Sequence, residues 1–218
     1  MPHSLAMIRE KLFTSVLSDT LDGLGYMNQA MSAKIRPLDE ETVLVGRART
    51  GLYMEVFHVE PGENPYLLEM RLIDDLKPDE VPVFSCARSP RVAPWGELLS
   101  TASKARGAAG AIMDGMVRDV RAIRKLGFPV FHGGIGPLDS KGRGKIMAID
   151  VPIECAGVRI EPGDLLFGDA DGVVSIPRAI EDKVIEAALA KVEGEDRTRE
   201  ALARGEKLAD VFARYGIL

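Results

Sequence analysis

The middle of the chain alternates between short apolar runs and amphipathic segments, and this alternation limits the fold more than any other feature. Apolar runs at residues 81–86, 111–113 and 129–131 predict strands. Between them, residues 97–106 and 120–125 have helical periodicity and are followed by glycine. Strands that alternate with helices are typical of parallel sheets. We therefore expect a largely parallel sheet layer in this part of the chain.

The segments before this region predict a helix, extended chain and a second helix. Residues 12–24 have apolar side chains at three- and four-residue steps, which is typical of an amphipathic helix. Residues 42–45 and 48–56 predict two strands separated by Gly46, because both are rich in β-branched or aromatic residues. Residues 66–76 predict a helix that follows a turn rich in proline and glycine.

The last third of the chain predicts a mainly antiparallel region and then helices. Strands are expected at residues 145–149, 153–160 and 165–176, joined by turn sequences that include EPGD and DG. A long helix is predicted from Ala179 onward. Residues 193–218 form a charged and then apolar tail, for which we expect packing on a neighbouring subunit.

Length and composition exclude several classes of protein. The 218 residues contain no repeat and no low-complexity linker, so we expect one α+β domain over residues 1–218. The 28 Lys and Arg against 33 Asp and Glu give a net charge of -5, which disfavours nucleic acid as a partner. No apolar run approaches the roughly 20 residues of a membrane span, and no secretion signal is recognisable, so a cytoplasmic protein without a membrane partner is expected. Cys86 and Cys155 are predicted to be buried thiols.

The chemistry is concentrated around a helix start and an adjacent Arg–Asp pair. A helix that begins at Gly96 leaves its first backbone amides unpaired, and such a terminus attracts anions. Arg118 follows the predicted strand at 111–113, and its guanidinium can bind a carboxylate or an enolate oxygen through parallel hydrogen bonds. Asp119 is suited to a hard cation such as Mg2+ or Mn2+. The set would polarise a 2-oxo acid, whereas a solvent-exposed ion pair is the competing interpretation of the two charged residues.

Long sequence words resemble the RraA-like family, which includes 4-hydroxy-4-methyl-2-oxoglutarate aldolases and regulator-of-ribonuclease-E homologues. The resemblance runs from about Ser18 to the C-terminus through the words GELLSTASKARGAAGAIMDGMVRDV, GFPVF, CAGVRIEPGDLLFGDADGVVSIP and VEGEDRTREALARGE. It implies a swivelling β/β/α fold with a C-terminal helical tail, assembled as a homotrimer or homohexamer with active sites between subunits. For the site, it implies that the substrate carboxylate binds the backbone amides of Gly96, Glu97, Leu98 and Leu99, that Arg118 binds the substrate, and that Asp119 holds the divalent metal.

The resemblance also implies an activity. In the aldolases of this family, the metal and the arginine stabilise the pyruvate enolate released from a 4-hydroxy-2-oxo acid, and oxaloacetate decarboxylation passes through the same enolate. Glu97 is a departure, because several members have Asp at this position. Glu193 and Glu195 are candidates for a carboxylate that reaches a neighbouring active site. A non-catalytic regulator that binds a ribonuclease or helicase is the alternative, while methyl transfer is disfavoured because no glycine-rich cofactor loop follows a first strand.

Overall fold

A mixed β-sheet forms the centre of the molecule in the computed structural model, which describes residues 3–217; Met1 and Pro2 of the expected domain and Leu218 at the end of the predicted tail lie outside the described residues. Within the described part, the strands follow the order β1-β5-β4-β3-β2-β9-β10, and β6 also pairs with β2. Strands β2, β3, β4 and β5 are mutually parallel, whereas β1, β6, β9 and β10 join antiparallel. The strands are β1 Arg36–Pro37, β2 Leu44–Glu55, β3 Glu80–Ser85, β4 Ala111–Val117, β5 Val130–Ile135, β6 Gly144–Ile149, β9 Leu165–Asp169 and β10 Gly172–Ile176.

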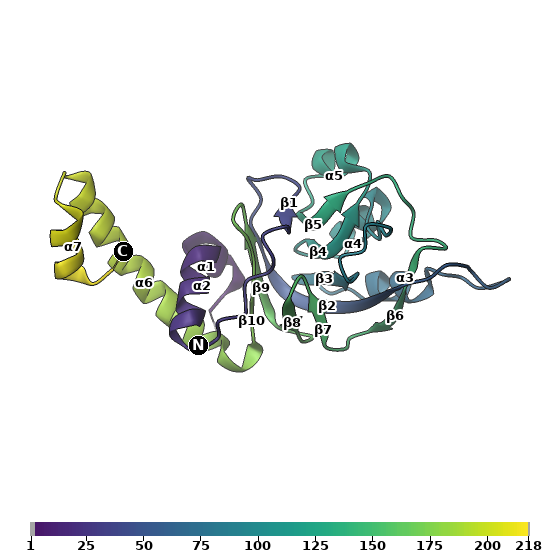
Figure 1. The fold of residues 1–218 in the computed structure, drawn as a ribbon, viewed down its shortest axis with the longest axis horizontal. Coiled ribbons are helices and arrows are strands. Elements are labelled where there is room, and N and C mark those ends of the chain that lie inside the picture. The colour runs from purple at the N-terminus through teal and green to yellow at the C-terminus, as the bar shows by residue number, and fades with distance from the viewer. Residues whose placement is uncertain (1–2, 218) are drawn as a thin grey trace.

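Helices cover this sheet in two groups, which Figure 1 shows at opposite sides of the molecule. One group connects the parallel strands and comprises α3 Leu67–Asp74, α4 Glu97–Ala105 and α5 Val120–Leu126. The other lies beside β9 and β10 and comprises α1 Leu5–Lys11, α2 Thr14–Gly23 and the first part of α6 Glu181–Ala203. A short 3-10 helix, Arg178–Ile180, precedes α6. The antiparallel hairpin of β7 Ile153–Cys155 and β8 Val158–Ile160 covers a further part of the sheet.

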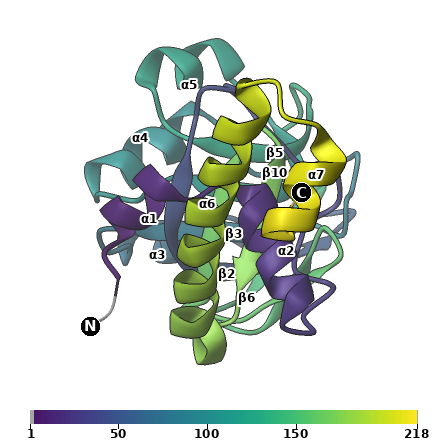
Figure 2. The ribbon, with the colours of Figure 1, turned by 90° about the vertical axis from the view of Figure 1, so that its left-hand side faces the viewer.

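The C-terminal helices extend away from the sheet. Figure 2 shows α6 running alongside α1 and α2, with α7 Leu208–Tyr215 folded back against its far end. The charged segment expected after residue 193 is largely a continuation of α6, which ends at Ala203. The expected α+β fold with a helical C-terminal segment is therefore confirmed.

Apolar side chains form three buried clusters between these layers. Helices α3, α4 and α5 pack over one face around Phe84, Trp95 and Met113. The β7–β8 hairpin packs over the other face around Ile112 and Phe131. The third cluster joins α1, α2 and α6 to β9 and β10, whose nearly continuous buried residues divide between this cluster and the second one. This packing holds the parallel strands between two apolar layers, as their near-continuous hydrophobic sequences require.

Two predictions in the first part of the chain are wrong, each for a tertiary reason. The helix expected at residues 12–24 begins at Thr14, because Asp169 accepts hydrogen bonds from the Thr14 amide and hydroxyl at 2.8 and 2.6 Å and fixes the helix start there. The two strands expected around Gly46 are one continuous strand, β2. A Cβ atom at Gly46 would lie 2.4 Å from the Asp79 carbonyl oxygen, so this glycine allows close approach of the chain and does not end the strand.

The strands on either side of the site are also longer than expected. Strand β4 continues to Val117, and β5 continues through Gly133 and Gly134 to Ile135. A Cβ atom at Gly133 would lie 2.5 Å from the Asp114 carbonyl oxygen, so glycine is needed for strand contact at this position.

Two further expectations concern the membrane and the cysteines. Among the helices of residues 3–217, none combines the length and apolar character needed to cross a membrane. Cys86 and Cys155 are both buried and free, as predicted.

Candidate functional site

A pocket of about 350 Å3 lies where the chain leaves the carboxyl ends of β3, β4 and β5. Crevices outside the carboxyl ends of parallel strands are the usual ligand sites of α/β sheets. The lining residues come from the three connections after these strands, from the beginning of α3 and from the first turn of α4. They are Tyr66, Glu69, Met70, Ala93, Pro94, Gly96, Leu98, Leu99, Arg118, Asp119, Asp139 and Ser140. A second hollow of about 640 Å3 adjoins the first and shares Arg118 and Asp119 with it.

The connection from β3 to α4 is held by a buried carboxylate. Asp114 of β4 accepts hydrogen bonds from the amides of Cys86 and Ala156. Ala87 and Arg88 come directly after Cys86 and adopt positive φ angles of 50° and 58°, a conformation that non-glycine residues rarely adopt. Asp114 thereby fixes the start of the connection that carries Gly96 into the pocket.

Helix α4 begins at the pocket wall because Trp95 anchors its first turn. The buried Trp95 indole donates to Ser100 Oγ at 2.8 Å, and Ser100 Oγ donates to the Gly96 carbonyl at 2.9 Å. Gly96 has an extended backbone and caps the helix without a side chain. Helical geometry leaves the amides of Leu98 and Leu99 without acceptors within the helix. These amides are suited to bind an anion, aided by the positive end of the helix dipole.

Arg118 and Asp119 lie beside this helix start. The Arg118 amide donates to the Trp95 carbonyl at 2.9 Å, which joins the end of β4 to the chain just before α4. Asp119 adopts a left-handed conformation, with φ of 58°, and its carbonyl oxygen accepts hydrogen bonds from the amides of Ala122 and Ile123 in α5. Its carboxylate oxygen Oδ2 accepts the Glu97 amide at 3.1 Å and lies 3.7 Å from Arg118 Nε. Both side chains remain partly exposed to the pocket, at 37% for Arg118 and 48% for Asp119.

Gly96 is required by this arrangement. A Cβ atom at position 96 would lie 2.6 Å from Asp119 Oδ2 and 3.2 Å from Arg118 Nε. The glycine therefore makes room for the carboxylate and guanidinium groups rather than serving only as a helix cap.

The structure brings the six predicted site residues to one place, with one qualification. Leu98, Leu99, Gly96, Arg118 and Asp119 line the pocket. Glu97 does not line the pocket: its amide donates to Asp119 Oδ2 at 3.1 Å, and its carboxylate accepts a hydrogen bond from Thr101 at 2.9 Å along the helix.

Glu193 and Glu195 lie elsewhere in the same chain. Both belong to α6, which packs against α1, α2 and α7, and Glu195 lies 3.9 Å from Arg199 on the same helix. Neither lines the pocket of its own chain. Whether either reaches a neighbouring subunit stays a prediction.

Three further ionisable residues of the pocket were not predicted from the sequence. Asp139, beyond β5, accepts from Arg118 Nη1 at 3.2 Å and from the Tyr66 hydroxyl at 2.6 Å. Burial raises the pKa of Asp139, but the Tyr66 hydrogen bond and the Arg118 charge together lower it by more. The pKa of Asp139 therefore lies below the ordinary carboxyl value. Burial and the bond to Asp139 raise the pKa of Tyr66 to about 12. At neutral pH, Asp139 is therefore an anion that orients Arg118, and Tyr66 is a neutral donor.

Glu69 is the third of these residues and is 6% exposed. It accepts a hydrogen bond from the buried Tyr53 hydroxyl. Burial raises the pKa of Glu69 to about 7, with a smaller opposing effect of the Tyr53 hydrogen bond. One signal could have identified it: Glu69, Leu72 and Ile73 have helical spacing and share the buried face of α3, where a carboxylate is unusual.

The donor groups of the pocket are compatible with a divalent cation. Among residues 3–217, no three His, Cys, Asp or Glu side chains gather closely enough to hold a metal ion by themselves. Mg2+ and Mn2+ do not need such a cage, since Mg2+ usually binds one or two carboxylates and completes its shell with water and substrate oxygens. The partly exposed Asp119 carboxylate fits that requirement, beside open space in two adjoining hollows.

Comparisons with known proteins agree with this fold. Residues 14–175 match the family model described as RraA-like, Aldolase/RraA. A relative from Halalkalibacterium halodurans, named "Putative 4-hydroxy-4-methyl-2-oxoglutarate aldolase", is 38% identical over 187 residues, which cover 86% of this chain and 82% of the relative.

Solved structures extend the likeness to nearly the whole chain. An uncharacterized protein from Pseudomonas syringae pv. tomato has a TM-score of 0.83 and 28% identity, with 97% of this chain and 98% of that chain covered. Streptomyces coelicolor RraAS2, described as an unusual member of the RNase ES inhibitor RraA protein family, has a TM-score of 0.80 and 25% identity, with 91% and 97% covered. Because the family model matches residues 14–175 and the Halalkalibacterium halodurans relative is 38% identical over 86% of this chain, the chain belongs to the RraA-like family.

Proposed function

We propose that the protein is a divalent-metal-dependent aldolase, a carbon–carbon lyase that cleaves a 4-hydroxy-2-oxo dicarboxylic acid such as 4-hydroxy-4-methyl-2-oxoglutarate to pyruvate. The observation that carries the proposal is the position of Arg118 and Asp119 beside the open amides of α4 in one pocket. The name of the Halalkalibacterium halodurans relative supports the same activity.

The residues of the pocket divide the work of binding. The amides of Leu98 and Leu99 bind the carboxylate next to the 2-oxo group, where the helix dipole favours negative charge. Arg118, oriented by Asp139, donates to the 2-oxo oxygen and stabilises the negative charge that develops there. Asp119 holds Mg2+ or Mn2+, which when bound supplies a Lewis acid for the same oxygen. Gly96 leaves room for both side chains.

Charge stabilisation at the 2-oxo oxygen is shared by two reactions. Aldol cleavage and oxaloacetate decarboxylation both place an electron pair on this oxygen and yield the enolate of pyruvate. A second activity as an oxaloacetate decarboxylase is therefore part of the proposal.

The first test measures pyruvate release from 4-hydroxy-4-methyl-2-oxoglutarate and from oxaloacetate, with Mg2+ and with chelator. Wild-type protein should release pyruvate only with the metal. Asp119→Asn retains a residue that tolerates the left-handed conformation but removes the charge, and it should lower turnover by about 1000-fold. Asp22→Asn, at an exposed position of α2, serves as the matched control and should leave turnover unchanged. Full metal-dependent activity in Asp119→Asn would show that the mechanism is wrong.

A regulator that binds a ribonuclease or helicase is the competing function, which the description of Streptomyces coelicolor RraAS2 favours. Absence of pyruvate from both substrates, together with tight and metal-independent capture of such a partner, would reverse the order of the two functions.

The proposed assembly is a homotrimer or homohexamer. Leu208 and Phe212 of α7 are about half exposed, at 53% and 50%, in the tail that we expect to pack on a neighbouring subunit. Sedimentation of the whole protein would measure the number of subunits.

A further inference from the structure

Glu69 is a buried carboxyl group in the wall of the pocket, and the binding scheme above gives it no role. It belongs to α3 and lines the same pocket as Arg118 and Asp139. One carboxyl oxygen, Oε2, accepts the Tyr53 hydroxyl. Within residues 3–217, the other oxygen, Oε1, has no hydrogen-bond partner and is not among the fully buried unpaired atoms. Glu69 therefore lines the pocket and has one carboxyl oxygen that no described residue binds.

The charges around Glu69 leave it unneutralised. The ionisable groups that face it are Tyr53 of β2, Tyr66 beside α3, Cys86 after β3, Arg118 after β4 and Asp139 after β5. Arg118 is the cation of this set, and its Nη1 already lies 3.2 Å from Asp139. Among the described residues, no basic group forms an ion pair with Glu69. Burial, aided by the Asp139 charge, outweighs the Tyr53 hydrogen bond and the Arg118 charge and raises the pKa of Glu69 to about 7, so both protonation states are populated near neutral pH.

We propose that Glu69 is the acid–base residue of the pocket, which takes the proton of the substrate 4-hydroxyl group and returns it to the methylene carbon of the enolate. This inference rests on the proposed aldolase function. It adds the group that transfers protons. Arg118 cannot do so while it binds oxygen as a cation, and Asp119 cannot do so while it binds the metal as an anion.

Glu69 accounts for both proton transfers of the reaction. The Glu69 carboxylate removes the hydroxyl proton at C4; the C3–C4 bond breaks, C4 becomes a carbonyl, and the bonding pair moves through C3 and C2 to the 2-oxo oxygen. The ketone product leaves. Protonated Glu69 then donates to C3, which becomes the methyl group of pyruvate as the C2 carbonyl reforms. Glu69 ends as the carboxylate, and no external oxidant or reductant is needed.

Tyr53 is the positioning residue for this group. Its hydroxyl is bound to Oε2, which leaves Oε1 as the oxygen that exchanges the proton. The same hydrogen bond lowers the pKa of Glu69 against the larger effect of burial. Tyr53→Phe should therefore raise the pKa of Glu69 while preserving the aromatic packing against Phe84.

The test follows exchange of the pyruvate methyl protons with D2O by NMR, with Mg2+ present, because this reaction isolates proton transfer at C3. Glu69→Gln should slow the exchange by at least about 100-fold. It should also remove the acid limb near pH 7 from the pH profile of aldol turnover. Glu60→Gln, an exposed carboxylate with 70% side-chain exposure, is the matched control and should retain the wild-type rate and limb. Thermal unfolding and circular dichroism check that each variant is folded.

The outcomes separate this inference from the proposed function. Suppose that wild-type protein exchanges the methyl protons and releases pyruvate, and that Glu69→Gln does both at the wild-type rate. The role of Glu69 is then contradicted, and the aldolase function stands. If wild-type protein shows neither proton exchange nor pyruvate release, the aldolase function and the inference are both contradicted. If Glu69→Gln does not fold, Tyr53→Phe decides: a shift of the acid limb to higher pH supports the inference, and an unmoved limb contradicts it.

Discussion

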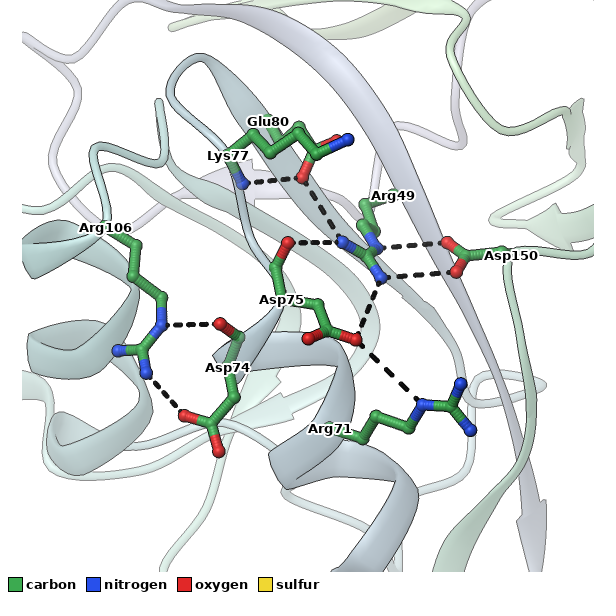
Figure 3. Close-up of polar contacts among 8 residues, drawn as sticks. All are labelled: Arg49, Arg71, Asp74, Asp75, Lys77, Glu80, Arg106 and Asp150. Atoms are coloured by element: carbon green, nitrogen blue, oxygen red, sulfur yellow. Dashed lines mark hydrogen bonds and ion pairs between the residues drawn. The ribbon is translucent and has the colours of Figure 1, made fainter.

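The two ends of the parallel strands differ in how their charges are satisfied. At the amino end of β3, Arg49 of β2 forms the centre of a polar network that Figure 3 shows joining β2 to the end of α3 and to the turn after β6. Its guanidinium donates to the Asp150 carboxylate at 3.0 and 3.3 Å and to the Asp75 carbonyl at 2.7 Å. Nearby, Arg106 at the end of α4 donates to the carbonyl and carboxylate of Asp74.

At the carboxyl end of the same strands, polar groups are left incompletely paired. The helix start at Gly96 has open amides, Asp119 is partly exposed, and Glu69 is buried without an ion-pair partner among the described residues. The comparison indicates that charge at one end stabilises the connections of the sheet. Charge at the other end is held ready for a ligand, at some cost in stability.

The first prediction tests this cost at Glu69. Its pKa is raised from 4.5 to about 7, so the native protein retains a proton that the unfolded chain has released within this pH window. The free energy of unfolding should therefore fall as the pH rises from about 4.5 to 7, by about 3 kcal/mol. Urea unfolding of wild type and Glu69→Gln at several pH values measures the difference. If the unfolding free energies of the two proteins change with pH in parallel, Glu69 is not the group that destabilises the folded protein as the pH rises.

The second prediction tests the space at the open end. In Gly96→Ala the new Cβ would lie 2.6 Å from Asp119 Oδ2, which must move from its place beside the Glu97 amide. Turnover of the aldol substrate should fall by about 100-fold, because displacements near 1 Å misplace reacting groups. Gly23→Ala in α2, where no atom lies within 4 Å of the new Cβ, is the control. Equal turnover in the two variants would contradict the role given to Gly96.

The third prediction tests the paired end. Arg49→Ala leaves the Asp150 carboxylate and the Asp75 carbonyl without their donor and should lower the free energy of unfolding by about 2 kcal/mol. Turnover should stay near the wild-type value, because no atom of Arg49 lines the pocket. The matched control is Arg71→Ala, whose exposed ion pair with Asp75 spans 3.9 Å and should contribute less than about 1 kcal/mol. Chemical denaturation measures the loss in unfolding free energy of both variants. A large fall in the turnover of Arg49→Ala with little loss of stability would contradict the contrast between the two ends.

The sequence predicts the site better where residues are adjacent than where they are brought together. Arg118 and Asp119 follow one strand, and Gly96 begins one helix, so local pattern is enough to select them. Asp139 and Tyr66 lie 73 positions apart in the chain and meet only through folding. Glu69 was missed because α3 is an ordinary amphipathic helix apart from one carboxyl on its buried face.

The same division holds for the fold. Periodicity and turn residues determined the order of helices and strands, the parallel middle and the antiparallel end, because these depend on which local side chains must be buried. Tertiary contacts alone decided that Gly46 lies within a strand, that Thr14 begins a helix, and that Glu69 faces the pocket beside Arg118 without an ion-pair partner. The physical reason is that close approach, capping from a distant strand and desolvation depend on neighbours that the chain acquires only when it is folded.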